Sequence, residues 1–408
     1  MIDTAALVRG ADPTSLLPAR RAAEAARMSP PLVLLQDRPL GTAADGELRH
    51  LIIEDGRGVR YGVPAVVRED GVRRAVPGDG AAWSVVRSLD LSTPDGERGI
   101  PVDQTNELVV VGDAVVVKWY LHPTTEDEAL RRLDSLAAAG FTGTPHVLGR
   151  LRAGGGEVIA LVMEYRADAA DGWEWLVDDV RAQARGGSAD DPAAPATVGD
   201  LVARMHLAFA REGVVRASAA QMRQRLAWAM SDAEAARLAP HLSAAVRQHL
   251  APIGDAVGTP LIPIHGDLHV GQVLRSAGLR YDLIDFDGNP VLPADERLAP
   301  GPPARDVAGM LASLDHVGRV VIHRTEDLGD SGRARVREWI ADAQAGFLAA
   351  YANRLASADA RELLDRSLLL PFMVQQECRE YIYAARYLPH WRYVPDAALP
   401  ELLDKESM

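Results

Sequence analysis

The sequence has little cysteine and no long apolar run. Its 408 residues include one cysteine, Cys378, so the chain alone forms neither an intramolecular disulfide nor a zinc site built from several thiolates. No run of about 18 apolar residues is present, which disfavours a membrane-spanning helix. The N-terminus also lacks the basic, apolar and small-residue regions of a secretory signal. We therefore expect a cytoplasmic protein with no membrane partner.

Positive charge is also scarce. Lys and Arg total 44 against 57 Asp and Glu, which gives a net charge of −13. A chain this acidic is a poor general ligand for nucleic acid, because binding to phosphates requires a basic surface. A single nucleotide needs only a local positive site, so this balance does not exclude one. An acidic surface also suits a cationic small molecule.

The length and residue pattern predict more than one domain. Apolar residues make up 48% and charged residues 25% of the chain, as in globular proteins. Residues 1–95 contain short alternating apolar runs between Gly, Asp and Pro, which predict a β-rich cap. Residues 96–170 contain two β-branched runs around Gly112-Asp113, then a helix pattern and another strand, which together predict a small lobe.

The remaining residues, 171–408, predict a mainly helical large lobe. Helical periodicity dominates it, apart from a motif-rich stretch at 261–290 and a low-complexity stretch at 184–199 that predicts a loop. The fold class is therefore α+β, with two lobes as in protein kinases and a β-rich cap in front. We find no internal repeats.

The stretch His265-Gly266-Asp267-Leu268-His269 carries the clearest chemistry. Asp267 lies five positions before Gln272, and a short apolar strand then leads to Asp285-Phe286-Asp287. Phosphoryl transfer needs a carboxylate that orients the attacking hydroxyl, and an amide oxygen and a second carboxylate that hold Mg²⁺. The order matches the D-x-x-x-x-N and D-F-G motifs of kinases, with Gln for Asn and Asp287 for glycine. The spacing predicts Asp267 as base, with Gln272 and Asp285 as metal ligands.

A lysine among valines supports the same chemistry. Lys118 lies on the second strand of the predicted hairpin, where a kinase places the lysine that contacts the ATP phosphates and pairs with a glutamate of the next helix. Glu128 is the preferred partner because it lies deeper in that helix than Glu126. Glu164 ends the next strand, where the backbone of a kinase hinge contacts adenine.

Together these motifs resemble a known family. HGDLHxxQ, IDFD and ARDVAGML are similar to the aminoglycoside phosphotransferase-like kinases and, within them, the maltokinases. The stretch QQECREYIYAARYLPHWRYVP resembles actinobacterial glucosamine kinases, which phosphorylate the 6-hydroxyl of glucosamine. The resemblance covers roughly the whole chain. It implies an ATP- and Mg²⁺-dependent sugar kinase that gives glucosamine 6-phosphate and ADP, and we expect it to act as a monomer.

The resemblance also implies roles for further residues. Asp306, in ARDVA, supports the catalytic loop or the substrate site. No GxGxxG precedes Lys118, so the segment with Gln104, Thr105 and Asn106 is expected to cover the phosphates. No APE-type segment follows DFD, which disfavours a protein substrate.

The amino group of such a sugar requires a partner. A buried ammonium is costly unless a carboxylate accepts its hydrogen bonds. Glu377 and Tyr381 lie one turn apart on a predicted helix, and Glu380 is the reserve carboxylate. Trp391, with Tyr393 nearby, could form an aromatic wall.

Other interpretations remain open on the sequence. His265 and His269 have the spacing of a metal-binding pair but lack an HExxH glutamate, so bracing of the loop is favoured. His206, Glu377 and Trp391 could each be packing or ion-pair residues instead of site residues. The alternative activities are maltokinase, giving maltose 1-phosphate, and aminoglycoside phosphorylation. A non-catalytic pseudokinase that only binds ligands is disfavoured, because the residues needed for phosphoryl transfer are all present: Lys118, Asp267, Gln272 and Asp285.

Overall fold

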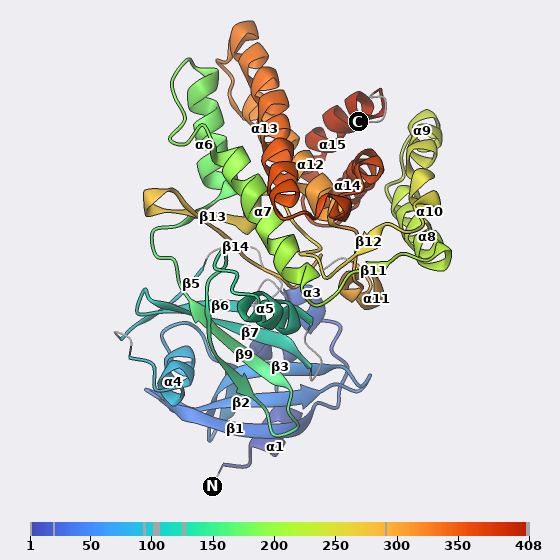
Figure 1. Cartoon of the computed structure of the whole chain (residues 1–408). Helices are drawn as coiled ribbons and strands as arrows, with labels where there is room; N and C mark the ends of the chain where they lie inside the picture. The colour runs from blue at the N-terminus through green and yellow to red at the C-terminus, as the bar shows by residue number, and fades with distance from the viewer. Residues whose placement is uncertain are drawn as a thin grey trace. The chain divides into compact units, whose positions relative to one another are not determined.

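The chain is described here from a computed structural model. The described residues are 2–18, 21–92, 95–100, 107–124, 128–289 and 292–404. They divide into two compact units (Figure 1). Unit 1 comprises Met1–Asp127 and Pro145–Ala167, and unit 2 comprises Glu128–Thr144 and Asp168–Met408.

Unit 1 begins with an antiparallel sheet of strands in the order β1-β2-β3-β4. The alternation of apolar residues explains why both faces of this sheet are covered. In β2, Leu51 and Ile53 pack with the N-terminal helices, whereas Leu48 and Ile52 pack toward the second sheet of the unit. The elements are α1 (Thr4–Arg9), α2 (Pro13–Leu16), α3 (Ala22–Ala25), β1 (Val33–Ala43), β2 (Gly46–Glu54), β3 (Arg60–Arg68), β4 (Gly71–Arg74) and α4 (Ala81–Ser88).

The second sheet of unit 1 has the order β5-β6-β7-β9-β8, and all its pairs are antiparallel. The predicted hairpin is confirmed: Gly112 and Asp113 have φ angles of 57° and 50°, as a tight hairpin turn requires. Val109 and Val117 share one apolar core with Leu48 of the first sheet. The strands are β5 (Glu97–Gly99), β6 (Glu107–Val111), β7 (Val115–Thr124), β8 (Val147–Arg152) and β9 (Val158–Glu164).

Unit 2 is mainly helical, as the sequence predicts, and its long helix α12 is largely buried. Helices α6, α13, α14 and α15 all contact α12. The α-helices are α5 (Glu128–Ala138), α6 (Gly172–Ala184), α7 (Ala194–Ala210), α8 (Ala219–Ala235), α9 (Pro240–Leu250), α10 (Pro252–Asp255), α11 (Ala294–Leu298), α12 (Pro303–Arg324), α13 (Gly329–Ser357), α14 (Leu369–Arg386) and α15 (Tyr393–Leu403).

Short strands of unit 2 frame the motif-rich stretch. Strands β10 (Ala170–Asp171), β13 (Val273–Ser276) and β14 (Arg280–Leu283) form one small sheet, and β11 (Val215–Arg216) pairs with β12 (Pro260–Leu261). The loop predicted at 184–199 is wrong in its second half, because α7 begins at Ala194. Pro195 stands in the first turn of α7, where its missing N–H breaks no helical hydrogen bond.

Candidate active site

Side chains of α12 hold the backbone of the loop that carries Asp267. Asp306, which is 2% exposed, accepts hydrogen bonds from the backbone N–H groups of His265 (2.7 Å) and Gly266 (2.9 Å). Its carboxylate also bonds to His206 Nε2 at 3.1 Å. Burial opposes ionisation of Asp306, but the His206 bond and the Gly266 amide keep its pKa below the ordinary value. Ser313, about two turns after Asp306 on α12, accepts from the Val270 N–H at 2.9 Å, so α12 supports both ends of the loop.

Asp267 itself is half-buried, and its Oδ1 accepts a hydrogen bond from Asn289 Nδ2 at 2.9 Å. Burial, with a contribution from the like charge of Asp285, raises the pKa of Asp267 to about 6. A carboxylate with a pKa near neutrality is suited to take up a proton and release it again. Asn289 was not among the predicted site residues. Its position shortly after the DFD motif is the only feature of the sequence that points to it.

The two predicted metal ligands lie on neighbouring segments. The Ile284 N–H donates to the Gln272 carbonyl at 3.0 Å, which brings Gln272 beside the residue that precedes Asp285. Asp285 has a φ angle of 63°, an unfavourable value for a residue other than glycine. Mg²⁺ commonly binds one or two protein oxygens together with waters and substrate phosphates. An amide oxygen and a carboxylate on adjacent segments fit that chemistry.

The histidines on either side of Asp267 brace the loop. His265 is fully buried, and its Nε2 lies 2.8 Å from the Ile284 carbonyl. His269 Nδ1 accepts from the Gly271 N–H at 3.1 Å, and its Nε2 lies 3.3 Å from the terminal amide of Gln272. Because Nδ1 is an acceptor, the proton of the neutral ring is on Nε2. Each histidine is thus bonded through one ring nitrogen to a backbone group of the 261–290 stretch, as expected for bracing residues.

The remaining residues predicted to bind the nucleotide belong to unit 1, except Glu128, which belongs to unit 2. Lys118 is buried in β7 (8% exposed), with its Nζ 5.9 Å from the centre of the Tyr120 ring. Glu164 ends β9, and its Oε2 accepts from the His146 N–H at 3.2 Å. Gln104 and Asn106 lie outside the described residues. Glu128 begins α5, but its side chain is likewise outside the described part of the chain.

The two candidate carboxylates of α14 have different surroundings. Glu377 is 1% exposed, and its Oε1 lies 2.7 Å from His316 Nε2 on α12. Burial alone would lower the pKa of His316, but the carboxylates of Glu377 and Glu380 raise it to about 9. Glu377 is therefore half of a buried ion pair between two helices, as the sequence left open.

Glu380, the reserve candidate, is half-buried and bonded to neutral donors. Trp391 Nε1 donates to its Oε2 at 2.8 Å, and Gln376 Nε2 donates to its Oε1 at 2.9 Å. The charge of Glu380 contributes to the raised pKa of Asp267. Burial lowers the pKa of His269, and the charge of Glu380 offsets part of that effect. Glu380 is therefore close enough to the catalytic loop to act on its groups.

Trp391 connects this part of α14 to the loop. It is 8% exposed, and its ring meets the Trp173 ring edge-on at a centroid distance of 5.3 Å. Trp173 in turn packs on Gly271, where an added Cβ would lie 2.8 Å from Trp173 Cδ1. Tyr381 is directed elsewhere. It is 4% exposed, Arg392 Cζ lies 5.3 Å from its ring centre, and burial and Asp396 raise its pKa.

The chain is similar to known proteins over almost its whole length. The profile of the phosphotransferase enzyme family matches residues 97–364. A glucosamine kinase from Streptacidiphilus jiangxiensis is 45% identical, with 97% of both chains covered. The chain belongs to the phosphotransferase enzyme family.

Two further proteins are similar to this phosphotransferase over most of its length. A glucosamine kinase from Mycolicibacterium smegmatis is 40% identical over 84% of this chain and 93% of its own. A solved structure of a glucosamine kinase in complex with glucosamine, ADP and inorganic phosphate is 41% identical. It superposes with a TM-score of 0.80 over 98% of this chain and 99% of the other. The predicted bilobal α+β kinase fold and the predicted sugar phosphotransferase activity are confirmed.

The family match leaves out two parts of the phosphotransferase. It starts after the first sheet of unit 1 and ends before α14, which carries Glu377 and Glu380. The whole-chain relatives cover both parts. The family match therefore includes the catalytic loop but not the carboxylates of α14.

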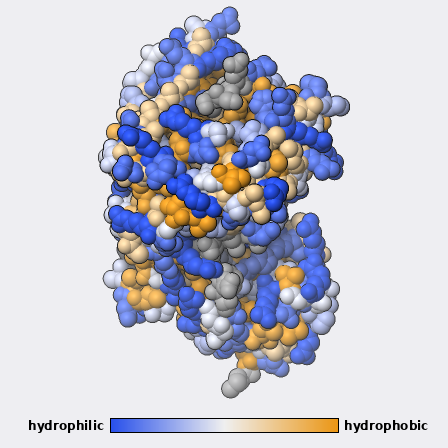
Figure 2. All heavy atoms as spheres, turned by 45° about the vertical axis from the view of Figure 1, so that its right-hand side comes forward, coloured by the Kyte–Doolittle hydropathy of each residue, from blue (hydrophilic) through white to orange (hydrophobic). Residues whose placement is uncertain are grey.

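The described surface of the phosphotransferase fits the composition. No described helix is long and apolar enough to cross a membrane. On the face shown in Figure 2, hydrophobic residues occur in small groups among hydrophilic ones. Within the described residues, no group of three or more His, Cys, Asp or Glu side chains could hold a metal ion. Gln272 and Asp285 remain the predicted metal ligands.

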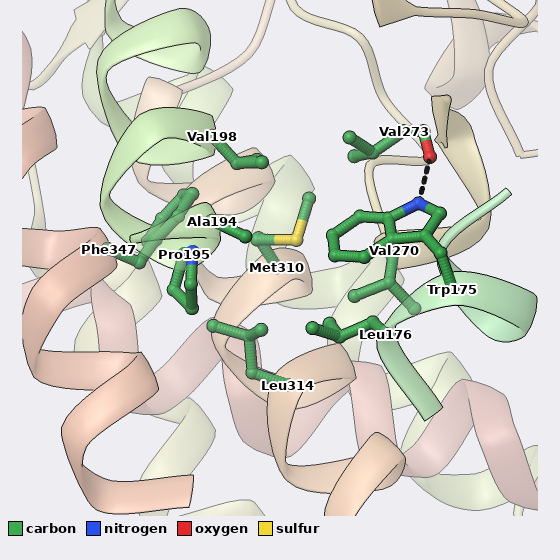
Figure 3. A pocket seen from close by; sticks show the side chains of 10 residues that line it. All are labelled: Trp175, Leu176, Ala194, Pro195, Val198, Val270, Val273, Met310, Leu314 and Phe347. Carbon is green, nitrogen blue, oxygen red and sulfur yellow. Dashed lines mark hydrogen bonds between the residues drawn. The ribbon is translucent and has the colours of Figure 1, made fainter. Parts of the chain in front are cut away.

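A small apolar cavity lies behind the loop of the phosphotransferase (Figure 3). Val270 and Val273, on either side of Gln272, form part of its wall. Trp175 Nε1 donates to the Val273 carbonyl at 3.2 Å and so fixes the end of the loop from this side. The other lining residues are Leu176, Ala194, Pro195, Val198, Met310, Leu314 and Phe347.

Proposed function

We propose that this phosphotransferase transfers the γ-phosphoryl group of ATP to the 6-hydroxyl of D-glucosamine, giving glucosamine 6-phosphate and ADP. Similarity to glucosamine kinases along almost the whole chain supports this substrate. The observation that carries the proposal is Glu380, a half-buried carboxylate with neutral hydrogen-bond donors that acts electrostatically on Asp267. We further propose that the enzyme acts as a cytoplasmic monomer.

Asp267 performs the proton transfer in this proposal. Its carboxylate accepts the proton of the sugar 6-hydroxyl while that oxygen forms a bond to the γ-phosphorus. The bond from the γ-phosphorus to the β,γ-bridging oxygen breaks, and ADP leaves with that oxygen. Asn289, by donating to one Asp267 oxygen, leaves the other oxygen to face the substrate. A pKa of about 6 makes Asp267 ionised, yet basic enough, at neutral pH.

The nucleotide is bound through groups that follow from the family resemblance. Lys118 contacts the phosphates, Glu128 supports Lys118, Gln104 and Asn106 cover the phosphates, and the backbone at Glu164 meets adenine. Gln272 and Asp285 hold Mg²⁺, which neutralises phosphate charge when bound. Asp306 supports the loop from its buried position on α12 and makes no contact with sugar.

Selectivity for an amino sugar is assigned to Glu380. A sugar ammonium can donate to Glu380 because that carboxylate is half-buried and bonded only to neutral donors among its described partners. Glu377, by contrast, is already paired with His316. Trp391 holds Glu380 in place and offers an apolar ring edge for the sugar, whereas Tyr381 supports the helix. A neutral disaccharide such as maltose would leave the Glu380 charge without a cationic partner.

The proposal is tested by a coupled assay of ADP release with glucosamine, glucose, maltose and an aminoglycoside. We expect glucosamine to have the highest kcat/KM, with the phosphate on the 6-oxygen by ³¹P–¹H NMR of the product. Equal or better turnover of maltose or the aminoglycoside would reject glucosamine as the substrate. ADP release without any phosphorylated sugar would reject a sugar kinase.

A further inference from the structure

One buried arginine connects the two loops that carry the reacting groups. Arg132, on α5, is 2% exposed and is among the largest fully buried side chains described. Its Nη1 donates to the carbonyls of His265 (3.3 Å) and Phe286 (2.9 Å). Its Nη2 donates to the Arg297 carbonyl at 3.0 Å. The guanidinium thus contacts the backbone two residues before Asp267 and one residue after Asp285.

Sequence pattern alone does not explain a charged group at this position. Leu133 and Leu136 place the buried face of α5 next to Arg132, and an apolar residue would be the ordinary choice on that face. A buried guanidinium carries a large desolvation cost unless its donors are satisfied. Here Nη1 and Nη2 donate to three backbone carbonyls in three separate segments, in the planar fork that an arginine provides.

Two glycines lie beside this guanidinium. A Cβ added to Gly288 would lie 3.4 Å from Arg132 Nη1 and 2.9 Å from the Arg297 side chain. A Cβ added to Gly266 would lie 3.9 Å from the same nitrogen. Both glycines have positive φ angles, 71° and 85°, so the two loops turn sharply around the arginine. The HGD and DFDG segments are therefore shaped to close on one side chain.

The arginine also supports a strained residue. Asp285, at a φ angle of 63°, is held on one side by the Ile284 N–H bond to Gln272. On its other side, Arg132 holds the Phe286 carbonyl. An unfavourable backbone conformation persists only where its surroundings fix it. Arg132 supplies one of the bonds that fix this conformation of Asp285.

We infer that Arg132 is a positioning residue that sets the separation of the Asp267 and Asp285 carboxylates through their backbone. The inference rests on the proposed function, because it assigns these two groups to phosphoryl transfer. Without Arg132, the side chains of both loops remain, but the hydrogen bonds that join the two loops are lost. Substrate binding is therefore retained, and the chemical step slows. A misplacement of about 1 Å can reduce a rate by roughly 10²-fold.

The test compares Arg132→Met, Arg132→Lys and Arg319→Met. Arg319 is a matched control, because it is mostly buried and bonded to Asp315 and Glu401, away from the loops. We expect kcat of Arg132→Met to fall by about 10- to 100-fold with KM for sugar and ATP within about threefold. Lysine, which can reach fewer carbonyls, should restore part of kcat. Arg319→Met should be less stable but keep its kcat.

Three outcomes would overturn the inference: unchanged kcat in folded Arg132→Met, a loss confined to KM, or an equal kcat loss in Arg319→Met at matched folded fraction. All variants are measured with whichever sugar the wild type phosphorylates best. A failure of glucosamine as substrate therefore remains distinct from a failure of Arg132 as positioning residue. If Arg132→Met does not fold, the Arg132→Lys variant alone decides between the kcat and KM effects.

Discussion

The region of the catalytic loop and α12, and the C-terminal helix α14, each contain one carboxylate bonded to a buried histidine and one bonded to neutral donors. In the loop region these are Asp306 with His206, and Asp267 with Asn289. In α14 they are Glu377 with His316, and Glu380 with Trp391. The histidine-paired member is buried in both regions, and the other is half-buried. We infer from this difference that a carboxylate already bonded to a buried histidine braces the site, whereas its neighbour is left to bind substrate.

Loss of the available carboxylate in the loop should have the largest effect. Asp267→Asn retains the shape of the side chain but cannot accept the hydroxyl proton, so kcat should fall by about 10²- to 10⁴-fold. Steady-state kinetics with glucosamine and ATP measure this, and thermal unfolding checks the fold. Activity of the variant within threefold of the wild type would show that Asp267 is not the base.

Substitution of Glu380 on α14 should have the second largest effect, with Glu377 as its control. Glu380→Gln should reduce kcat/KM for glucosamine by about 30-fold, since a charged hydrogen bond contributes about 2 kcal/mol. The preference for glucosamine over glucose should shrink by the same factor. Glu377→Gln is the matched control, and it should destabilise the fold while keeping that preference. If Glu377→Gln loses the preference and Glu380→Gln keeps it, the roles of the two residues are reversed.

The pH dependence of kcat/KM tests whether Asp267 must be ionised for the reaction. Asp267 must be ionised to act as base, and its pKa is about 6. As pH falls below this value, the ionised fraction and therefore kcat/KM should fall about tenfold per pH unit. An ordinary aspartate would keep the rate constant down to about pH 4. A flat profile between pH 7 and pH 5 would contradict the burial-raised pKa.

The buried pair of His316 and Glu377 should affect the stability of the fold more than the rate of the reaction. The pKa of His316 is raised to about 9 from its model-peptide value of 6.5, so the pair stabilises the fold fully below pH 6.5. That contribution, about 3 kcal/mol at most, should be lost as pH rises through 9. The Tm of the wild type should therefore decrease over this range, whereas His316→Gln should have a lower Tm that varies less with pH. Parallel profiles of the two proteins would show that the pair does not titrate in this way.

The sequence predicted groups that local spacing determines. Asp267, Gln272 and Asp285 lie within one stretch, and the hairpin around Gly112 and the helix at Glu128 follow from short-range rules. Contacts between distant segments could not be predicted from the sequence. Helical periodicity puts Glu377 and Glu380 on the same helix, but it cannot say that His316 occupies one and Trp391 the other. Arg132 was missed because its partners are backbone carbonyls, which every residue possesses.

The apolar core that Leu48 and Ile52 share with Val109 and Val117 limits how the chain can be shortened. A fragment cut to the family match, residues 97–364, would keep the catalytic loop. It would also expose the inner face of the second sheet to water and delete the helix with Glu380. Gene fragments for expression, domain exchange or directed evolution should therefore keep the N-terminal sheet and α14 together with the kinase core.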